Sequence, residues 1–158
     1  MESGAQVSFV ESIVELILIF LELYDITFQK IAFAGINPHA GEGGYMGREE
    51  IDIVLPAMEE LKAQGINALG PFPADTLFIE KIRTQYDGIV SMYHDQGHIP
   101  FKMLAFDRGV NSTLGLPIIR TSVDHGTAFD IAWKGIADTG SLKEAIKLAT
   151  RKVLYKRK

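Results

Sequence analysis

This chain of 158 residues contains four histidines, whose side chains can bind metals or transfer protons: His39, His94, His98 and His125. A neutral imidazole is the commonest metal ligand in proteins, and the ligands of one site can come from loops that are distant in sequence. A single histidine in a loop is more often a hydrogen-bonded structural residue. Residue type alone therefore leaves a metal site and a structural role open.

Three polar clusters follow short apolar segments that have the character of buried β-strands. Residues 37–39 follow KIAFAG, residues 94–96 follow GIVSM, and residues 124–127 follow PIIRTSV. Ligands of α/β sheets gather at the carboxyl ends of the strands. The coincidence of three such clusters favours a binding or catalytic site at that edge of a sheet.

The stretch INPHAGEGG (36–44) sets His39 in front of three glycines in four positions. A dinucleotide fingerprint requires G-x-G-x-x-G or a final alanine directly after a strand. Gly41 and Gly43 match this pattern, but its last position is Met46, and no G-K-[ST] follows. The loop is therefore not a standard nucleotide cradle. Its glycines can still let backbone N–H groups approach an anion, and a tight strand-to-helix turn explains them equally well.

The cations near these loops are Lys102, Arg108 and Arg120. Arg120 follows the apolar run LPII, so its guanidinium can emerge at a strand end and bind a phosphate or carboxylate. A surface ion pair is an equal alternative. Asp95 and Asp124 each adjoin a histidine, where a carboxylate can orient an imidazole or cap a helix.

Alternating strands and helices must position these residues. Strands are expected at 30–35, 66–69, 88–92, 110–114 and 118–122, and helices at 48–64, 76–84, 100–106, 125–133 and from 141 onward. Pro56 should kink the first of these helices or mark a late start, Asp75 should cap the second, and Ser141 with Glu144 should form a capping box for the last. The order predicts a layered α/β fold with a mainly parallel sheet and flanking helices, in a single domain over 1–158.

Composition narrows the class of protein. Apolar residues make up 47% and charged residues 23% of the chain, which is typical of a soluble globular domain. The net charge of -4 gives no indication of nucleic-acid binding, and the basic C-terminal residues, including Lys152, are expected to be a solvated helix end. The absence of cysteine excludes disulfides, thiolate zinc sites and cysteine nucleophiles, and it agrees with a cytoplasmic location.

The apolar N-terminal segment is expected to be a buried amphipathic helix rather than a membrane span or a signal peptide. Its longest apolar run, residues 16–21, lies between Glu15 and Glu22, whereas a span needs about 20 mostly apolar residues. The apolar positions at helical spacing are Val10, Ile13, Val14, Ile17 and Leu21.

Longer motifs connect the chain with a known family. INPHAGEGG, GPFPADTLF, MYHDQGHIPFK, GVNSTLGLPIIRTSVDHGTA and GIAD occur in this order, and the sequence resembles the C-terminal half of the 4-hydroxythreonine-4-phosphate dehydrogenase family of pyridoxal phosphate biosynthesis. The resemblance implies oxidation of a phosphorylated hydroxy acid with NAD or NADP, followed by decarboxylation. It also implies a divalent metal (Zn, Mg or Co), a cytoplasmic homodimer with a shared active site, and part of an isocitrate/isopropylmalate-dehydrogenase-like fold.

The same resemblance assigns residues. It implies that His39 and His94 are metal ligands, and that the third histidine ligand of the family lies upstream of the first helix of this chain. It implies substrate binding by Lys102, Asn111 and Arg120. His125 has no ligand role in the family pattern, and Trp133 stands where the family usually has a glycine.

The chain departs from the family by lacking the family's N-terminal half, so it is expected to be weakly active or inactive alone. A non-catalytic dimerising remnant is an alternative. HDQGHIPFK, with His98, favours a second alternative, the relatives that oxidise other four-carbon phosphorylated acids such as 4-phosphothreonate.

Overall fold

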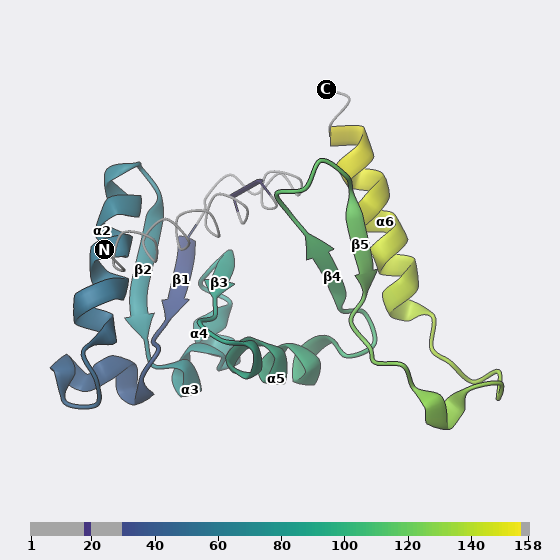
Figure 1. Cartoon of the computed structure of the whole chain (residues 1–158), viewed down its shortest axis with the longest axis horizontal. Coiled ribbons are helices and arrows are strands. Elements are labelled where there is room, and N and C mark those ends of the chain that lie inside the picture. Colours follow the sequence, from purple (N-terminus) through teal and green to yellow (C-terminus); the bar gives the residue numbers. More distant parts are fainter. Residues whose placement is uncertain (1–17, 20–29, 156–158) are drawn as a thin grey trace. The chain divides into compact units, whose positions relative to one another are not determined.

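The computed structural model describes residues 18–19 and 30–155, which divide into two compact units, Met1–Gly97 and His98–Lys158. Figure 1 shows their helices and strands in chain order. The helix expected around residues 10–21 lies almost wholly outside the described residues. Within the described part of the chain, no helix has the length and apolar character needed to cross a bilayer.

The first unit is built on a parallel sheet of three strands, β1 (Lys30–Ala34), β2 (Asn67–Phe72) and β3 (Gly88–Val90), in the order β2-β1-β3. The three strands expected in this part of the chain are confirmed. β2 ends at Phe72, three residues beyond the strand end expected at residue 69. Its register with β1 shifts between Ala32 and Ala34, and this irregularity admits Pro71, which has no N–H for the ladder.

Both faces of β1 are covered, as a central parallel strand requires. Ile31 and Phe33 point to one face, where they join buried residues of β2 and of α2 (Leu55–Ala63) in one core cluster. Ala32 and Ala34 point to the other face and pack with Leu77 of α3 (Ala74–Leu77). Alternate side chains of a strand face opposite sides, so β1 unites the two halves of the core.

The helices of the first unit only partly follow the expectations. Residues 48–64 form a π-turn, η2 (Glu50–Val54), followed by α2, whose first turn contains Pro56, so the expected interruption at this proline is confirmed. The single helix expected at 76–84 is wrong. Two short helices, α3 and α4 (Glu80–Arg83), replace it, and Asp75 lies inside α3 rather than capping it.

α5 (His94–Ala105) begins six residues earlier than the helix expected at 100–106 and contains Pro100. It leads into an antiparallel hairpin of β4 (Val110–Thr113) and β5 (Arg120–Val123). The mixed α/β class is therefore confirmed, but these two strands form a separate antiparallel sheet. The helix expected at 125–133 is wrong except for three residues, η3 (Phe129–Ile131), because Ala128 and Trp133 on either side have positive φ.

α6 (Gly140–Tyr155) packs against the hairpin. The expected capping box is wrong: the Ser141 hydroxyl donates to the carbonyl of Gly109, and the carboxylate of Asp138 accepts from the N–H of Gly140. Lys152 is only 7% exposed and donates to the Ser112 hydroxyl, so the expectation of a solvated helix end is wrong for this residue.

Candidate functional site

His39 lies in an unusual turn that follows β1, η1 (Pro38–Gly44). Five consecutive residues, from His39 to Gly43, have φ between 45° and 78°, which is the left-handed region. This conformation costs roughly 1–2 kcal/mol for each residue that is not glycine. His39, Ala40 and Glu42 therefore adopt it only because their surroundings enforce it, which is typical of functional sites.

The carboxylate of Glu50 fixes the start of this turn through hydrogen bonds. Glu50 is 2% exposed, and its two oxygens accept hydrogen bonds from the backbone N–H (2.7 Å) and the side-chain amide (2.9 Å) of Asn37. Burial opposes ionisation of this carboxyl, but the Asn37 hydrogen bonds outweigh it and lower its pKa. A Cβ on Gly41 would lie 2.5 Å from the Glu50 carboxylate, so only glycine fits between them.

Glu50 is a supporting residue that sequence reasoning missed. The available signal was its position four residues before Val54, on the apolar face of the segment expected to be helical. A carboxylate on a buried helix face needs hydrogen-bonding partners, and the nearby INPH segment supplies them through Asn37.

His94 is the first residue of α5, which begins after a connection of residues 91–93 that follows β3. Its Nδ1 lies 2.7 Å from a carboxylate oxygen of Asp95, and both side chains are exposed. A carboxylate in this position orients an imidazole and fixes its tautomer. Of the two roles left open for Asp95 by the sequence, the structure therefore shows the contact with a histidine.

Gln96 connects the two loops that carry His39 and His94. Its side-chain oxygen accepts from the N–H of Met92 (2.7 Å), and its side-chain nitrogen donates to the carbonyl of Gly35 (2.7 Å). Met92 follows β3 and Gly35 follows β1, and the glutamine is 9% exposed. Sequence reasoning included Gln96 in a polar cluster but gave it no role.

β1 and β3 are parallel neighbours, with Phe33 opposite Val90, so their carboxyl ends lie at the same sheet edge. The loops bearing His39 and His94 therefore leave the sheet at one edge, as expected for two of the three strand-end clusters. The third cluster, residues 124–127, follows β5 of the separate hairpin, so its expected place at this edge is wrong. Both imidazoles belong to exposed residues. Among residues 18–19 and 30–155, no three His, Cys, Asp or Glu side chains are grouped in a way that could hold a metal ion.

In the second unit, Asn111 and Arg120 share one face of the hairpin. The pairs Asn111–Ser122 and Thr113–Arg120 alternate with pairs whose side chains face α6. On that other face, the Thr121 hydroxyl donates to the carbonyl of Ala145 (2.9 Å). On the open face, the Arg120 guanidinium donates to the Thr113 hydroxyl (2.9 Å), which is a cross-strand contact rather than an ion pair.

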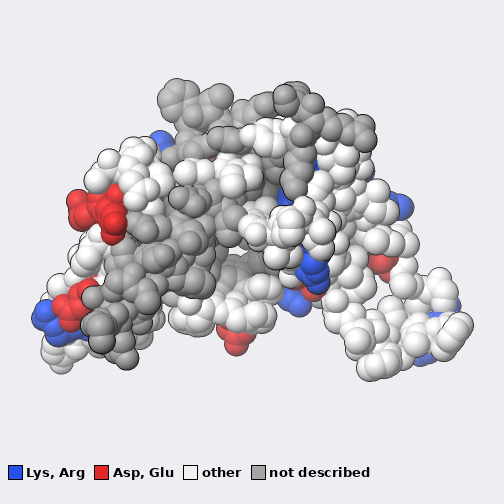
Figure 2. Space-filling model, turned by 45° about the horizontal axis from the view of Figure 1, so that its top comes forward, with Lys and Arg blue, Asp and Glu red and all other residues white. Residues whose placement is uncertain are grey.

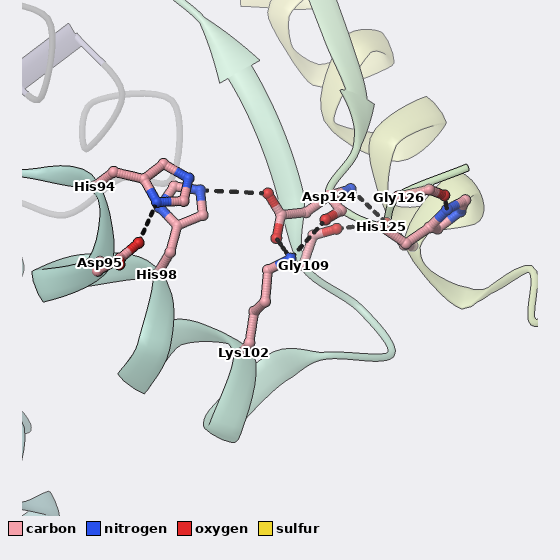
Figure 3. A network of polar contacts seen from close by, with 9 residues as sticks. His94, Asp95, His98, Lys102, Gly109, Asp124, His125 and Gly126 are labelled. Carbon is pink, nitrogen blue, oxygen red and sulfur yellow. Dashed lines mark hydrogen bonds and ion pairs between the residues drawn. The ribbon is translucent and has the colours of Figure 1, made fainter. Parts of the chain in front are cut away.

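Asp124, two residues beyond Ser122, brings two basic side chains of α5 to the end of β5. Its carboxylate lies 3.6 Å from Nε2 of His98 and 3.9 Å from Nζ of Lys102, and only 14% of its side chain is exposed (Figure 3). Lys102 also donates to the main-chain carbonyl of Asp124 (3.4 Å). The histidine that contacts this carboxylate is thus His98 and not the adjacent His125, whose ring contacts the carbonyl of Gly126.

The structure therefore places the five expected site residues in two sets. His39 and His94 follow neighbouring strands of the parallel sheet in the first unit. Asn111 and Arg120 lie in the hairpin of the second unit, and Lys102 lies in the part of α5 that belongs to this unit. On the face shown in Figure 2, acidic and basic side chains are scattered among uncharged ones, with no broad basic patch among the described residues.

Comparisons with known proteins agree with the motifs. The family model for the pyridoxal phosphate biosynthetic protein PdxA matches residues 6–149. A 4-hydroxythreonine-4-phosphate dehydrogenase from Desulforapulum autotrophicum is 59% identical over 126 residues, which are 80% of this chain and 37% of that protein. A D-threonate 4-phosphate dehydrogenase from Pectobacterium atrosepticum is 55% identical over 140 residues, covering 89% and 43% of the two chains.

Among solved structures, a 4-hydroxythreonine-4-phosphate dehydrogenase from Klebsiella pneumoniae superposes with a TM-score of 0.76 at 51% identity, covering 90% of this chain and 43% of that one. The chain thus spans less than half the length of these relatives. The family match nevertheless extends over most of its residues. This chain belongs to the family of the pyridoxal phosphate biosynthetic protein PdxA.

Proposed function

We propose that this chain supplies the C-terminal half of a dehydrogenase that oxidises 4-hydroxythreonine 4-phosphate with NAD or NADP and releases CO₂ from the product, in pyridoxal phosphate biosynthesis. The observation that carries the proposal is the common sheet edge from which the His39 and His94 loops emerge, in a chain of this family. Both units would belong to one domain of an isocitrate/isopropylmalate-dehydrogenase-like fold. The complete protein would act as a cytoplasmic homodimer.

The second unit would bind the substrate. Lys102 and Arg120 carry the positive charges that a phosphate and a carboxylate require, and Asn111 can donate or accept a hydrogen bond on the same hairpin face as Arg120. Thr113 orients the Arg120 guanidinium, and Asp124 keeps the Lys102 ammonium close to the end of β5. These contacts hold the cations in place before the substrate arrives.

His39 and His94 would hold a divalent metal ion such as Zn, Mg or Co. Two exposed imidazoles, one of them with a carboxylate on its Nδ1, fit part of such a site. The described residues supply no third ligand grouped with them, so we propose that further ligands come from outside this range, across the dimer interface. A bound divalent ion lowers the pKa of a coordinated hydroxyl and polarises a carbonyl.

The reaction needs no protein nucleophile, which agrees with a chain that lacks cysteine. A bound NAD or NADP would supply the hydride acceptor for oxidation of the substrate hydroxyl, which would also give up its proton. The resulting β-keto acid loses CO₂. The basic side chains would bind the anionic ends of the substrate throughout, so that its reacting carbon stays in one position.

A second candidate substrate is D-threonate 4-phosphate. His98 and Lys102 both approach the carboxylate of Asp124, so His98 adds a further basic side chain near Lys102, and a dehydrogenase of this name matches 89% of the chain. The two acids differ at carbon 2, where threonine carries an ammonium group and threonate a hydroxyl. The more negative threonate is better matched to an additional basic residue.

The decisive experiment measures NADH formation with each acid and added Co²⁺, in this chain and in a chimera that joins the N-terminal half of a full-length relative to it. We expect metal-dependent turnover in the chimera and its loss in His39→Ala and in His94→Ala. His125→Ala is the matched control and should retain turnover. A chimera inactive with both acids, or active without either histidine, would contradict the proposal and leave a non-catalytic dimerising protein as the better reading.

A further inference from the structure

We propose that Gln96 is a positioning residue that fixes the separation of the two histidine-bearing loops. The proposal deepens the proposed function, because the purpose of the fixed separation would be to present His39 and His94 to one metal ion. Its structural content, a bridge between two loops, does not depend on which substrate the protein uses.

The bridge is complete at both ends. The primary amide of Gln96 uses its oxygen for the N–H of Met92 and its nitrogen for the carbonyl of Gly35, both at 2.7 Å. These are short and favourable distances for such bonds. Gly35 is 61 residues away in sequence, so the amide joins segments that the chain itself does not hold together.

The two backbone groups that Gln96 binds lie close in sequence to the two histidines. Gly35 lies four residues before His39, and Met92 lies two residues before His94. On the other side of the first loop, a Cβ on Gly35 would meet the backbone of Ala40 at 2.8 Å, so the strand end and the left-handed turn are in close contact. A shift at Gly35 would therefore be transmitted to the turn that contains His39.

The chemistry of the bridge requires glutamine. The N–H of Met92 needs an acceptor, whereas the carbonyl of Gly35 needs a donor, and only an amide of this length offers both. Glutamate has the same shape but no donor for Gly35. Methionine has a similar length but neither function. Gln85 supplies a matched control, since its amide donates to Lys81 within one exposed helical turn and joins no distant segments.

Spin labels can test the bridge directly, because the chain contains no cysteine. His39→Cys and His94→Cys, introduced together, give two labelling sites at exposed positions. We expect a narrow distribution of label-to-label distances by dipolar EPR in the Gln96 background and in Gln85→Glu. Gln96→Glu and Gln96→Met should broaden it. Unchanged distributions in these variants would overturn the proposal.

Two further measurements distinguish the positioning role of Gln96 from a general effect on stability and from the proposed metal-binding function. Gln96→Glu should remain folded by circular dichroism, and unfolding of both Gln96 variants would overturn the positioning role. In the chimera with its native histidines, Gln96→Glu should raise the Kd for Co²⁺ about tenfold, as loss of an outer support does in metal sites. Absence of Co²⁺ binding by the unsubstituted chimera would count against the metal role of the proposed function, while the EPR result would still decide on Gln96.

Discussion

Glu50 accepts two hydrogen bonds from Asn37, which lies 13 residues earlier, and these bonds fasten the start of the left-handed turn to η2. They lower the pKa of Glu50 in the folded chain despite its burial. A lowered pKa contributes stability above the unfolded value, about 4.3, and this contribution disappears as the pH falls through the folded value.

Glu50→Gln should therefore destabilise the chain by about 1–3 kcal/mol at neutral pH, because hydrogen bonds to a charged group are lost. The difference from the unsubstituted chain should shrink below about pH 4. Urea unfolding between pH 7 and pH 3 measures both effects. Glu59→Gln, in an exposed pair with Lys62, is the control and should change little. A difference that persists undiminished in acid would contradict this account.

Alanine substitutions at Gly41 and Gly43 form a matched pair that tests how closely the Glu50 carboxylate packs against the turn. Both have positive φ, 78° and 66°, so alanine is strained at either position. A Cβ on Gly41 would meet the Glu50 carboxylate at 2.5 Å, whereas one on Gly43 would meet nothing within 4 Å. Gly43→Ala should cost roughly 1 kcal/mol, from the backbone alone. Gly41→Ala should cost at least about 1 kcal/mol more, because a buried hydrogen-bonded carboxylate must move. Equal thermal shifts would refute this difference.

Burial, more than distance, should decide the strength of the ion pair between Asp124 and Lys102. Their atoms are 3.9 Å apart, against 2.8 Å for the surface pair of Lys62 and Glu59, but the Asp124 side chain is only 14% exposed. A double-mutant cycle with Lys102→Met and Asp124→Asn should yield a coupling of about 1 kcal/mol, since a desolvated pair is screened less.

The same cycle for Lys62→Met and Glu59→Gln should give about 0.5 kcal/mol or less. Urea unfolding of the unsubstituted chain, the four single variants and the two double variants supplies both couplings. A larger value for the surface pair would show that Asp124 does not hold Lys102, and the positioning of this substrate-binding lysine would then need another explanation.

Trp133 offers a substitution that should stabilise the chain. Its φ is 65° and its side chain is fully exposed, so the residue has backbone strain without compensating burial. Trp133→Gly should gain roughly 0.5–1 kcal/mol after the entropy of glycine is subtracted. Ile136→Gly removes another exposed apolar side chain where φ is not positive, and it should destabilise. Melting temperatures that move in the same direction for both would exclude strain relief.

The sequence predicted well those elements whose pattern of apolar residues is compatible with only one type of secondary structure. KIAFAG is buried on both faces, as a central parallel strand must be, and the break at Pro56 follows from its missing N–H. The start of α5 was not predictable in this way. Its first turn, HDQG, carries no apolar periodicity, and the side chain that anchors it, Gln96, finds its partner in a distant strand end.

The candidate site shows the same division. Strand-end clusters led to His39 and His94, because topology brings the ends of neighbouring parallel strands together. The supporting residues Glu50, Gln96 and Asp124 could not be assigned, since each is defined by contacts across 13 to 61 residues of sequence. The sequence paired Asp124 with the adjacent His125, whereas the structure places its carboxylate near His98 of α5, and this contact could not be predicted because the start of α5 was not known.

The strict alternation along the hairpin limits how this segment can change in length. Insertion of one residue in β4 or β5 would exchange the two faces of that strand. Ser112 and Thr121 would lose their partners in α6, and Asn111 or Arg120 would turn toward the helix. Length changes must therefore fall in the turn between Thr113 and Arg120 or occur in steps of two. In homologues that keep this site, we expect insertions and deletions to obey that parity.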